Sequence, residues 1–334
     1  MVVSVCHTTH AHSGIAVGPS WTRFAASYKL TRFVTDSWES KPPNRIFFLG
    51  MGFVGQFFAQ ELKNQGWAVS GTSTSILKKK KLEDSGYDVF HFDANEPETS
   101  ILEVLKYHTH MIVSIPPLVG IGDPVSLKYL PNLCVYGNCG GEWVDEDSPT
   151  NPSDELAKLR LAAEKGWLSL GHYLGISANV FRLGGIYGPG RSAVDTIIKQ
   201  EALSKSQRFR VHKQYTSRVH VEDICQALKA SICASTHREL YNIVDDDPAP
   251  REEVFAYARN LIEKKWPGQL KQFSNQDESL VTVKKEGVLG EKRVSNAQMK
   301  KELGVRLLHP SYKSGLQSIV DQMENPFQYS AYSS

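Results

Sequence analysis

The chain has 334 residues, of which 41% are apolar and 22% are charged, and its formal net charge is +2. This composition excludes a disordered or fibrous protein, and the length allows one large domain or a domain with an appendage. No run of eighteen apolar residues occurs in the chain, so the sequence predicts no membrane span and no membrane partner.

Residues 1–44 differ in composition from the rest of the chain. They are rich in Ser and Thr, and no acidic residue precedes Asp36. This pattern favours a transit peptide and a plastid (chloroplast) location; the alternative is a disordered leader on a cytoplasmic protein. Four of the 38 basic and two of the 36 acidic residues lie in this leader, which leaves 34 of each in the remainder. That balance predicts no nucleic-acid partner.

The five cysteines do not predict a disulfide framework or a metal site. Their number is odd and their spacing is not that of a secreted disulfide scaffold, so a reducing compartment is expected. Residues 6–12, CHTTHAH, contain four potential ligands but have no second cluster to complete a site. Chance composition explains them better than metal binding does.

The strongest motif follows a short apolar segment at 45–50, which predicts a strand, and precedes an amphipathic segment at 53–65, which predicts a helix. Between them lies a G-x-G-x-x-G turn, whose glycines allow the turn, the approach of a pyrophosphate and close helix packing. A strand before it and a helix after it make this a dinucleotide-binding motif. The predicted cofactor contacts here are Gly50, Gly52, Phe53, Val54 and Gly55.

The next predicted strand, at 67–75, bears on the choice of cofactor. No acidic residue occurs between Gly66 and Lys81, where an NAD enzyme commonly carries the Asp or Glu that binds the ribose. Hydroxyl groups of Thr72 and Ser73 and a run of four lysines lie there instead. NADP(H) is therefore favoured over NAD(H), although a lysine run also occurs on ordinary solvated helix faces.

Two further predicted strands continue the pattern. The strand at 87–93 ends in Asp93, which is placed to reach the adenine end of the cofactor. The strand at 110–117 ends in Ser114, Ile115 and Pro116, which would border the middle of the cofactor. Strands that alternate with helices predict an α/β fold with a doubly wound parallel sheet.

The connection after this strand is unusually short. Only residues 118–128 separate it from the next apolar segment, which begins at Tyr129. Parallel strands need a crossover of about a dozen residues or more, usually a helix. We therefore expect that a crossover helix and part of the following strand are missing, as an alternative transcript or an error in the gene model would produce. An uncovered sheet face would reduce stability or promote aggregation.

Three later segments carry a resemblance to a known family. In order they are FRLGGIYGPGRS at 181–192, SRVHVEDICQAL at 217–228 and LYNIVDDDPAPREEVFAYA at 240–258. With the glycine turn they resemble the extended short-chain dehydrogenase/reductases, which include NAD-dependent epimerases and dehydratases. The resemblance covers about residues 45–320. It implies a Rossmann domain at 45–180, and at 181–334 the remaining Rossmann strands interleaved with a small C-terminal subdomain that binds a small-molecule substrate. It leaves a homodimer open.

The same resemblance implies a substrate cleft lined by Tyr187, Arg191 and Arg218, whose side chains donate hydrogen bonds. The alternative is that Tyr187 packs in the core and that Arg191 pairs with a carboxylate. For Asp223 the simplest role is to cap or orient local backbone.

The family's usual chemistry needs a Tyr with a Lys four residues later, and none of the 13 tyrosines has one. The resemblance places Leu156 and Arg160 at those positions, as in an atypical subgroup that includes the bacterial YeeZ-type proteins. Residues 129–141 lie where the family has its fifth strand and its catalytic Ser or Thr, and those positions hold Pro131, Asn132, Leu133 and Cys134. Tyr136 lies at the strand end that faces the cofactor in the family, so it becomes the candidate proton donor, and Arg160 becomes the candidate contact to the nicotinamide ribose. Cys134 is more simply an inert core residue.

Two functions remain open at this point. The first is an NAD(P)-dependent oxidoreductase or epimerase-like enzyme that acts on a small hydroxyl or carbonyl substrate. The second is a non-catalytic NADP(H)-binding sensor or scaffold protein, which uses the same motifs and needs no proton donor.

Overall fold

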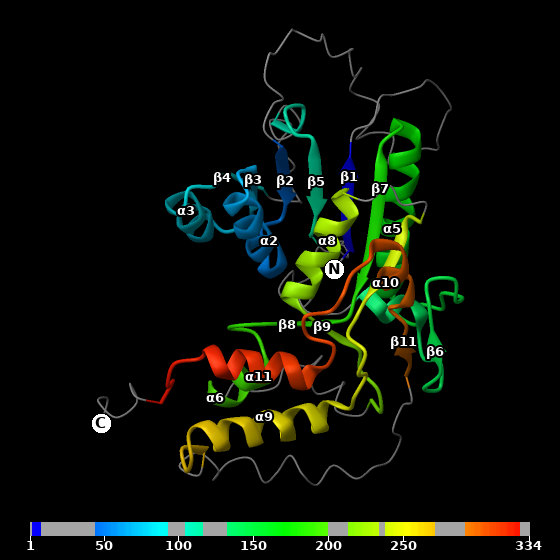
Figure 1. Ribbon diagram of the computed structural model, residues 1–334. Helices are drawn as coiled ribbons and strands as arrows, with labels where there is room; N and C mark the ends of the chain where they lie inside the picture. The colour runs from blue at the N-terminus through cyan, green and yellow to red at the C-terminus, as the bar shows by residue number, and fades with distance from the viewer. Residues whose placement is uncertain are drawn as a thin grey trace.

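The computed structural model describes residues 2–7, 44–92, 104–115, 132–199, 213–233, 238–270 and 291–327. A sheet of seven strands in the order β10-β7-β1-β5-β2-β3-β4 forms the centre of the molecule (Figure 1). All neighbouring pairs are parallel except those that involve β1. The predicted doubly wound parallel sheet is therefore confirmed. The strands are β1 (Val2–His7), β2 (Arg45–Leu49), β3 (Ala68–Ser73), β4 (Asp88–His91), β5 (His110–Val113), β7 (Ser177–Leu183) and β10 (Leu240–Ile243).

Helices cover both faces of this sheet. Phe181 of β7 belongs to the apolar core shared with α2 (Phe53–Asn64) and α8 (Val221–Cys233), while the next residue, Arg182, pairs with α5 (Glu155–Leu174). Because successive side chains of a strand point to opposite faces, α5 lies on the face opposite α2 and α8. Helix α3 (Ile76–Asp84) packs beside β3 and β4.

Strand β1 comes from the first residues of the chain and lies in the middle of the sheet. It pairs antiparallel with both β5 and β7, the position that the fifth parallel strand of a doubly wound sheet would hold. The expectation that a crossover helix and part of the following strand are missing stays a prediction. Residues 2–7 were predicted to belong to a leader outside the fold. They lie in the sheet instead, because the backbone edges of β5 and β7 offer them hydrogen-bond partners. The short connection at 118–128 lies outside the described residues.

The segment expected to be the fifth strand is instead a single 3₁₀ helix, η1 (Asn132–Tyr136). It lies against α5 and β7 at the side of the sheet rather than within it. Parallel strands need a crossover of about a dozen residues or more, and only residues 118–128 separate Tyr129 from the strand predicted at 110–117.

The carboxyl ends of the parallel strands face a smaller C-terminal layer (Figure 1). There β8 (Gly185–Tyr187) pairs with β9 (Arg218–His220), and helices α6 (Ala193–Ile198), α9 (Arg251–Lys265) and α11 (Tyr312–Gln322) enclose an apolar cluster of their own. A second small ladder joins β6 (Trp143–Val144) to β11 (Arg293–Val294), and α10 (Ala297–Leu303) follows it.

None of the described helices is both long enough and apolar enough to cross a membrane.

Candidate functional site

The turn between β2 and α2 is held by hydrogen bonds from the two neighbouring strands. The backbone N–H of Gly50 donates to Oγ1 of Thr72 at 2.8 Å, and the hydroxyl of Ser114 donates to the carbonyl of Gly50. Gly50 has a φ of +99°, and a Cβ there would lie 2.8 Å from Cγ2 of Ile115. Only glycine fits this position without strain, so the role predicted for the first glycine of the motif is the one the geometry requires.

The other two glycines of the turn face different surroundings. A Cβ at Gly55 would lie 3.1 Å from the carbonyl oxygen of Gly50, so this glycine allows α2 to pack closely on the turn. A Cβ at Gly52 would meet no atom of the described residues within 4 Å. Gly52 is also the N-cap of α2, whose first turn carries no side-chain cap and no acidic residue. Open space at an uncapped, positively polarised helix N-terminus fits a pyrophosphate.

The residues predicted to favour NADP(H) over NAD(H) already have hydrogen-bond partners within the protein. Thr72 is 1% exposed and its hydroxyl accepts the hydrogen bond from Gly50, so it stabilises the turn rather than offering its hydroxyl to a phosphate. Ser73 ends β3, and its hydroxyl accepts from the N–H of Ser75 at 3.4 Å. The predicted contacts Asp93 and Pro116 lie outside the described residues.

Arg191 lies close to the glycine turn. Its guanidinium sits 5.2 Å from the ring centroid of Phe53, the first residue of α2. Gly188 also packs closely here, since a Cβ on it would lie 2.6 Å from Cγ1 of Val221 and 3.3 Å from Cζ of Phe53. The structure thus brings together the glycine turn and one of the predicted substrate residues, which are about 140 positions apart in sequence.

Tyr187 and Arg218, the other predicted cleft residues, have packing roles instead. Tyr187 is 8% exposed, its ring packs edge-on against His220, and its hydroxyl lies 3.4 Å from the carbonyl of Ser311. Burial raises the pKa of Tyr187, so its phenol stays protonated. Arg218 is buried and donates to the carbonyl of Ala249 at 2.8 Å and to the hydroxyl of Thr216. The cleft role predicted for these two residues is therefore corrected.

Tyr136 does not face a cleft either. It is 1% exposed, and its hydroxyl donates to Oδ1 of Asn242 at 2.8 Å. Its ring lies 4.8 Å from the guanidinium of Arg182, and burial raises its pKa. The prediction that this phenol is the proton donor does not hold in this arrangement, because the 3₁₀ helix turns the side chain into the core beneath β10.

The positions that correspond to the missing pair are also enclosed. Leu156 is 9% and Arg160 is 1% exposed, and Nη1 of Arg160 donates to the sulfur of Cys134 at 3.2 Å. One turn later on α5, Glu164 forms a buried pair with Arg182 at 2.8 Å. The sequence alone did not predict this pair, because its partners lie 18 positions apart on a helix and a strand.

The corner between β9 and α8 is fixed by Asp223, which is completely buried. Its carboxylate accepts hydrogen bonds from the backbone N–H groups of Leu308 at 2.6 Å and His309 at 3.1 Å. Asp223 was predicted to cap or orient local backbone, but the backbone that it orients belongs to a segment 85 positions away. Burial, together with the nearby His309, lowers the pKa of His220 to about 4, so this imidazole is neutral at pH 7.

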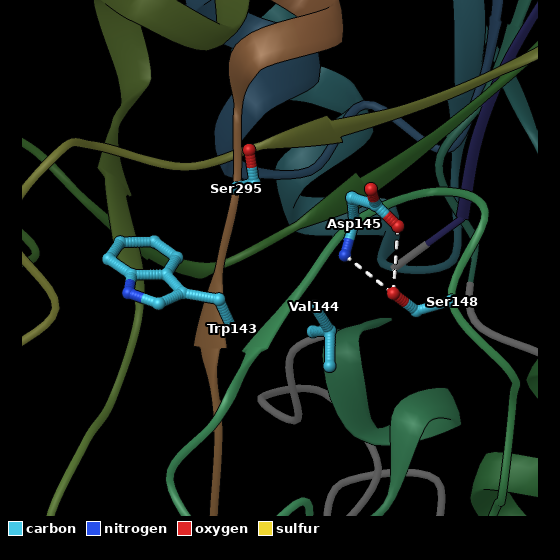
Figure 2. A pocket seen from close by; sticks show the side chains of 5 residues that line it. All are labelled: Trp143, Val144, Asp145, Ser148 and Ser295. Carbon is cyan, nitrogen blue, oxygen red and sulfur yellow. Dashed lines mark hydrogen bonds between the residues drawn. The ribbon is translucent and has the colours of Figure 1, made fainter.

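A shallow hollow lies beside the small β6–β11 ladder (Figure 2) and is lined by Trp143, Val144, Asp145, Ser148 and Ser295. Its one carboxylate, Asp145, accepts a hydrogen bond from the hydroxyl of Ser148 at 2.7 Å. The backbone N–H of Asp147 also donates to it, at 3.2 Å. These contacts form a local turn, and the hollow is formed by elements other than the glycine turn.

Comparison with known proteins identifies relatives along most of the chain. No protein-family profile matches it. It is 26% identical to Protein YeeZ of Escherichia coli strain K12 over 223 residues, which cover 60% of this chain and 77% of that protein. A solved structure of a conserved protein of unknown function from Silicibacter pomeroyi is 30% identical, with a TM-score of 0.62 over 84% of this chain and 100% of that one.

More distant solved structures share the fold. The UDP-glucuronic acid 4-epimerase of Bacillus cereus, in complex with NAD, is 16% identical with a TM-score of 0.59 over 83% of this chain and 96% of its own. The dTDP-glucose 4,6-dehydratase of Bacillus anthracis, also in complex with NAD, is 15% identical with a TM-score of 0.59 over 86% and 97%. At these identities the likeness is one of fold.

Proposed function

Because the chain belongs to the atypical extended short-chain dehydrogenase/reductases, we propose that it binds a nicotinamide dinucleotide on its glycine turn and acts as an oxidoreductase or epimerase-like enzyme. The observation that carries the proposal is the open space at Gly52, directly before an α2 N-terminus that has no side-chain cap. The surrounding backbone already holds this space open through the bonds that Gly50 makes to Thr72 and Ser114.

The proposed cofactor is NADP(H) in preference to NAD(H). The fold neighbours from Bacillus cereus and Bacillus anthracis are complexes with NAD, which supports a nicotinamide cofactor in general. The preference for NADP(H) rests on the sequence around the end of β3. This strand ends in Ser73, and no acidic residue lies between Ser73 and Glu83. A carboxylate there would bind a ribose hydroxyl and repel a 2′-phosphate. The lysines at 78–81 add positive charge beside that position.

In the proposed reaction the cofactor supplies or accepts a hydride, and the protein orients a small hydroxyl or carbonyl substrate. Arg191 is the substrate-binding residue, since its guanidinium lies beside Phe53 at the start of α2. A guanidinium binds carboxylate or phosphate groups in a fixed geometry, so an anionic substrate fits best.

A second candidate function, nucleotide binding without turnover, is favoured by a different observation. The phenol of Tyr136 and the guanidinium of Arg160 are both enclosed, and Leu156 carries no ionisable group. A protein that senses or stores the cofactor would need none of them.

Titration calorimetry with NADPH and NADH, followed by a turnover screen on carbonyl substrates, tests both functions. The variant Gly52→Ala is expected to fold normally and to lose at least about tenfold in affinity, because its Cβ occupies the space of the pyrophosphate. Gly166→Ala in α5 is the matched control, since its Cβ also enters open space but lies away from the turn.

The outcomes separate the alternatives. Equal affinity of Gly52→Ala and wild-type protein would refute the site. Binding that is lost in Gly52→Ala, with no turnover by the wild type, would select the sensor. Tighter binding of NADH than of NADPH would refute the proposed cofactor preference.

A further inference from the structure

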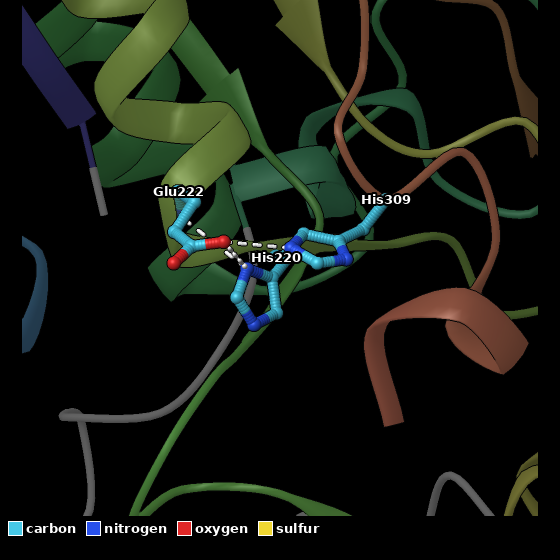
Figure 3. A group of neighbouring side chains, drawn as sticks. All are labelled: His220, Glu222 and His309. Atoms are coloured by element: carbon cyan, nitrogen blue, oxygen red, sulfur yellow. Dashed lines mark hydrogen bonds and ion pairs between the residues drawn. The ribbon is translucent and has the colours of Figure 1, made fainter. Parts of the chain in front are cut away.

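Three potential metal ligands meet at the corner between the sheet and the C-terminal layer (Figure 3). His220 ends β9, Glu222 lies in the first turn of α8, and His309 lies in the segment before α11. Oε2 of Glu222 is 2.7 Å from Nε2 of His309 and 3.5 Å from Nδ1 of His220. One ligand atom from each residue falls within 4.8 Å of the others.

The two imidazoles are held in place by their surroundings. His220 is 2% exposed and packs against the ring of Tyr187, whose centroid lies 5.1 Å away. His309 is buried, and its backbone N–H donates to Asp223. Their ring centroids are only 4.0 Å apart. By contrast the Glu222 side chain is 45% exposed, so this ligand can adjust and solvent can reach the cluster.

The hydrogen bonds leave acceptor atoms facing one another. The backbone N–H of Glu222 lies 3.3 Å from Nδ1 of His220, which places a lone pair rather than a proton on that nitrogen; a metal ion would take this lone pair in place of the long N–H contact. The same Nδ1 faces the carboxylate of Glu222, and the proton of His220 then lies on Nε2, which is buried and has no hydrogen-bond partner among the residues that the structure describes. A lone pair and a carboxylate side by side repel each other unless a cation lies between them.

We infer that His220, Glu222 and His309 bind a divalent transition-metal ion of the Zn²⁺ class. Two imidazole nitrogens and one carboxylate oxygen form a ligand set of the kind that Zn²⁺ binds, with the fourth position left to water. In tetrahedral coordination the ligand atoms lie about 3.3 Å apart. Nδ1 of His220 and the Glu222 oxygen are already near that spacing. The shorter His309–Glu222 distance opens by rotation of the exposed Glu222 side chain.

This site is separate from the nucleotide site and does not depend on the proposed function. Its ligands come from β9, α8 and the segment before α11, whereas the glycine turn lies between β2 and α2. This site could not be predicted from the sequence, because only two of the ligands are close in the chain and the third lies 87 positions away from Glu222.

Metal binding by the full chain can be measured without any assay of activity. The apo protein is titrated with ZnCl₂ by calorimetry and with CoCl₂ by visible absorption, where four-coordinate Co²⁺ absorbs strongly. We expect His309→Ala and Glu222→Gln each to lose at least about tenfold in affinity. Glu222→Gln is the safer variant for folding, because its side chain is half-exposed and keeps its shape.

His172→Ala is the matched control. His172 forms a similar 2.6 Å pair with Glu239, but both side chains are exposed and no second histidine among the described residues joins them. This variant should bind zinc as the wild type does. The inference is overturned if wild-type protein binds no zinc, or if Glu222→Gln and His309→Ala bind it as tightly as His172→Ala. Nucleotide calorimetry on the same variants should be unchanged, so failure of this site and of the cofactor site are distinguishable.

Discussion

Glu164→Gln should strongly destabilise the protein, because it leaves the charge of Arg182 unpaired in the core. The two side chains are 2% and 4% exposed, and Arg182 makes three contacts to the carboxylate at 2.8, 3.1 and 3.3 Å. Removing one partner of such a buried ion pair costs about 3–5 kcal/mol, since the remaining charge has lost its solvation and its counter-charge. We therefore expect a loss of this size in the free energy of unfolding.

Urea unfolding at pH 7, followed by far-UV circular dichroism, measures this loss. Glu155→Gln on the same helix is the control: its pair with Lys158 is exposed, and such pairs contribute about 0–1 kcal/mol. In the double variant Glu164→Leu/Arg182→Met, most of the stability should return, because no unpaired charge remains. A loss of less than about 1 kcal/mol in Glu164→Gln would refute the reasoning, as would a double variant less stable than the single one.

Three further predictions concern the sheet, the core tyrosine and pH. Deleting residues 2–7 removes the backbone partners of both β5 and β7. The free energy of unfolding should decrease by several kcal/mol, at about 1 kcal/mol per net hydrogen bond, and light scattering should show aggregation. An unchanged melting temperature would contradict the placement of β1 in the sheet. Tyr136→Phe should cost about 1 kcal/mol, since it removes the hydrogen bond to Asn242, and calorimetry should show unchanged nucleotide affinity. Burial raises the pKa of Asp245 well above its usual value. The unfolding free energy should therefore decrease as pH rises from about 4 toward that raised pKa. Asp245→Asn should remove this decrease and be the more stable protein at pH 7; an equal pH slope in both proteins would contradict this.

The glycine turn could be predicted from sequence because its physics is local. Gly50, Gly52 and Gly55 lie within six positions, and the strand before them and the helix after them follow from hydrophobic periodicity. The alternation of strands and helices likewise predicted the parallel sheet. The short connection after β5 predicts that a crossover helix and part of the next strand are missing, and this stays a prediction.

Only the tertiary structure decided which segment lies between β5 and β7 and which polar side chains are exposed to solvent or ligand. An antiparallel ladder accepts any segment with free backbone groups, so nothing local in Val2–His7 marks it as the partner of β5 and β7. Tyr136 and Tyr187 are sequestered because of elements that pack on them from distant parts of the chain, and periodicity does not report such contacts.

The same distinction separates the two candidate sites. For the nucleotide site, the sequence by itself determined the essential residues, because spacing along a tight turn fixes the backbone that faces the phosphates. For His220, Glu222 and His309, only the fold decides that they meet, since Asp223 ties the segment before α11 to the start of α8. That tie is a long-range hydrogen-bonded contact, and its geometry exists only once both segments are packed.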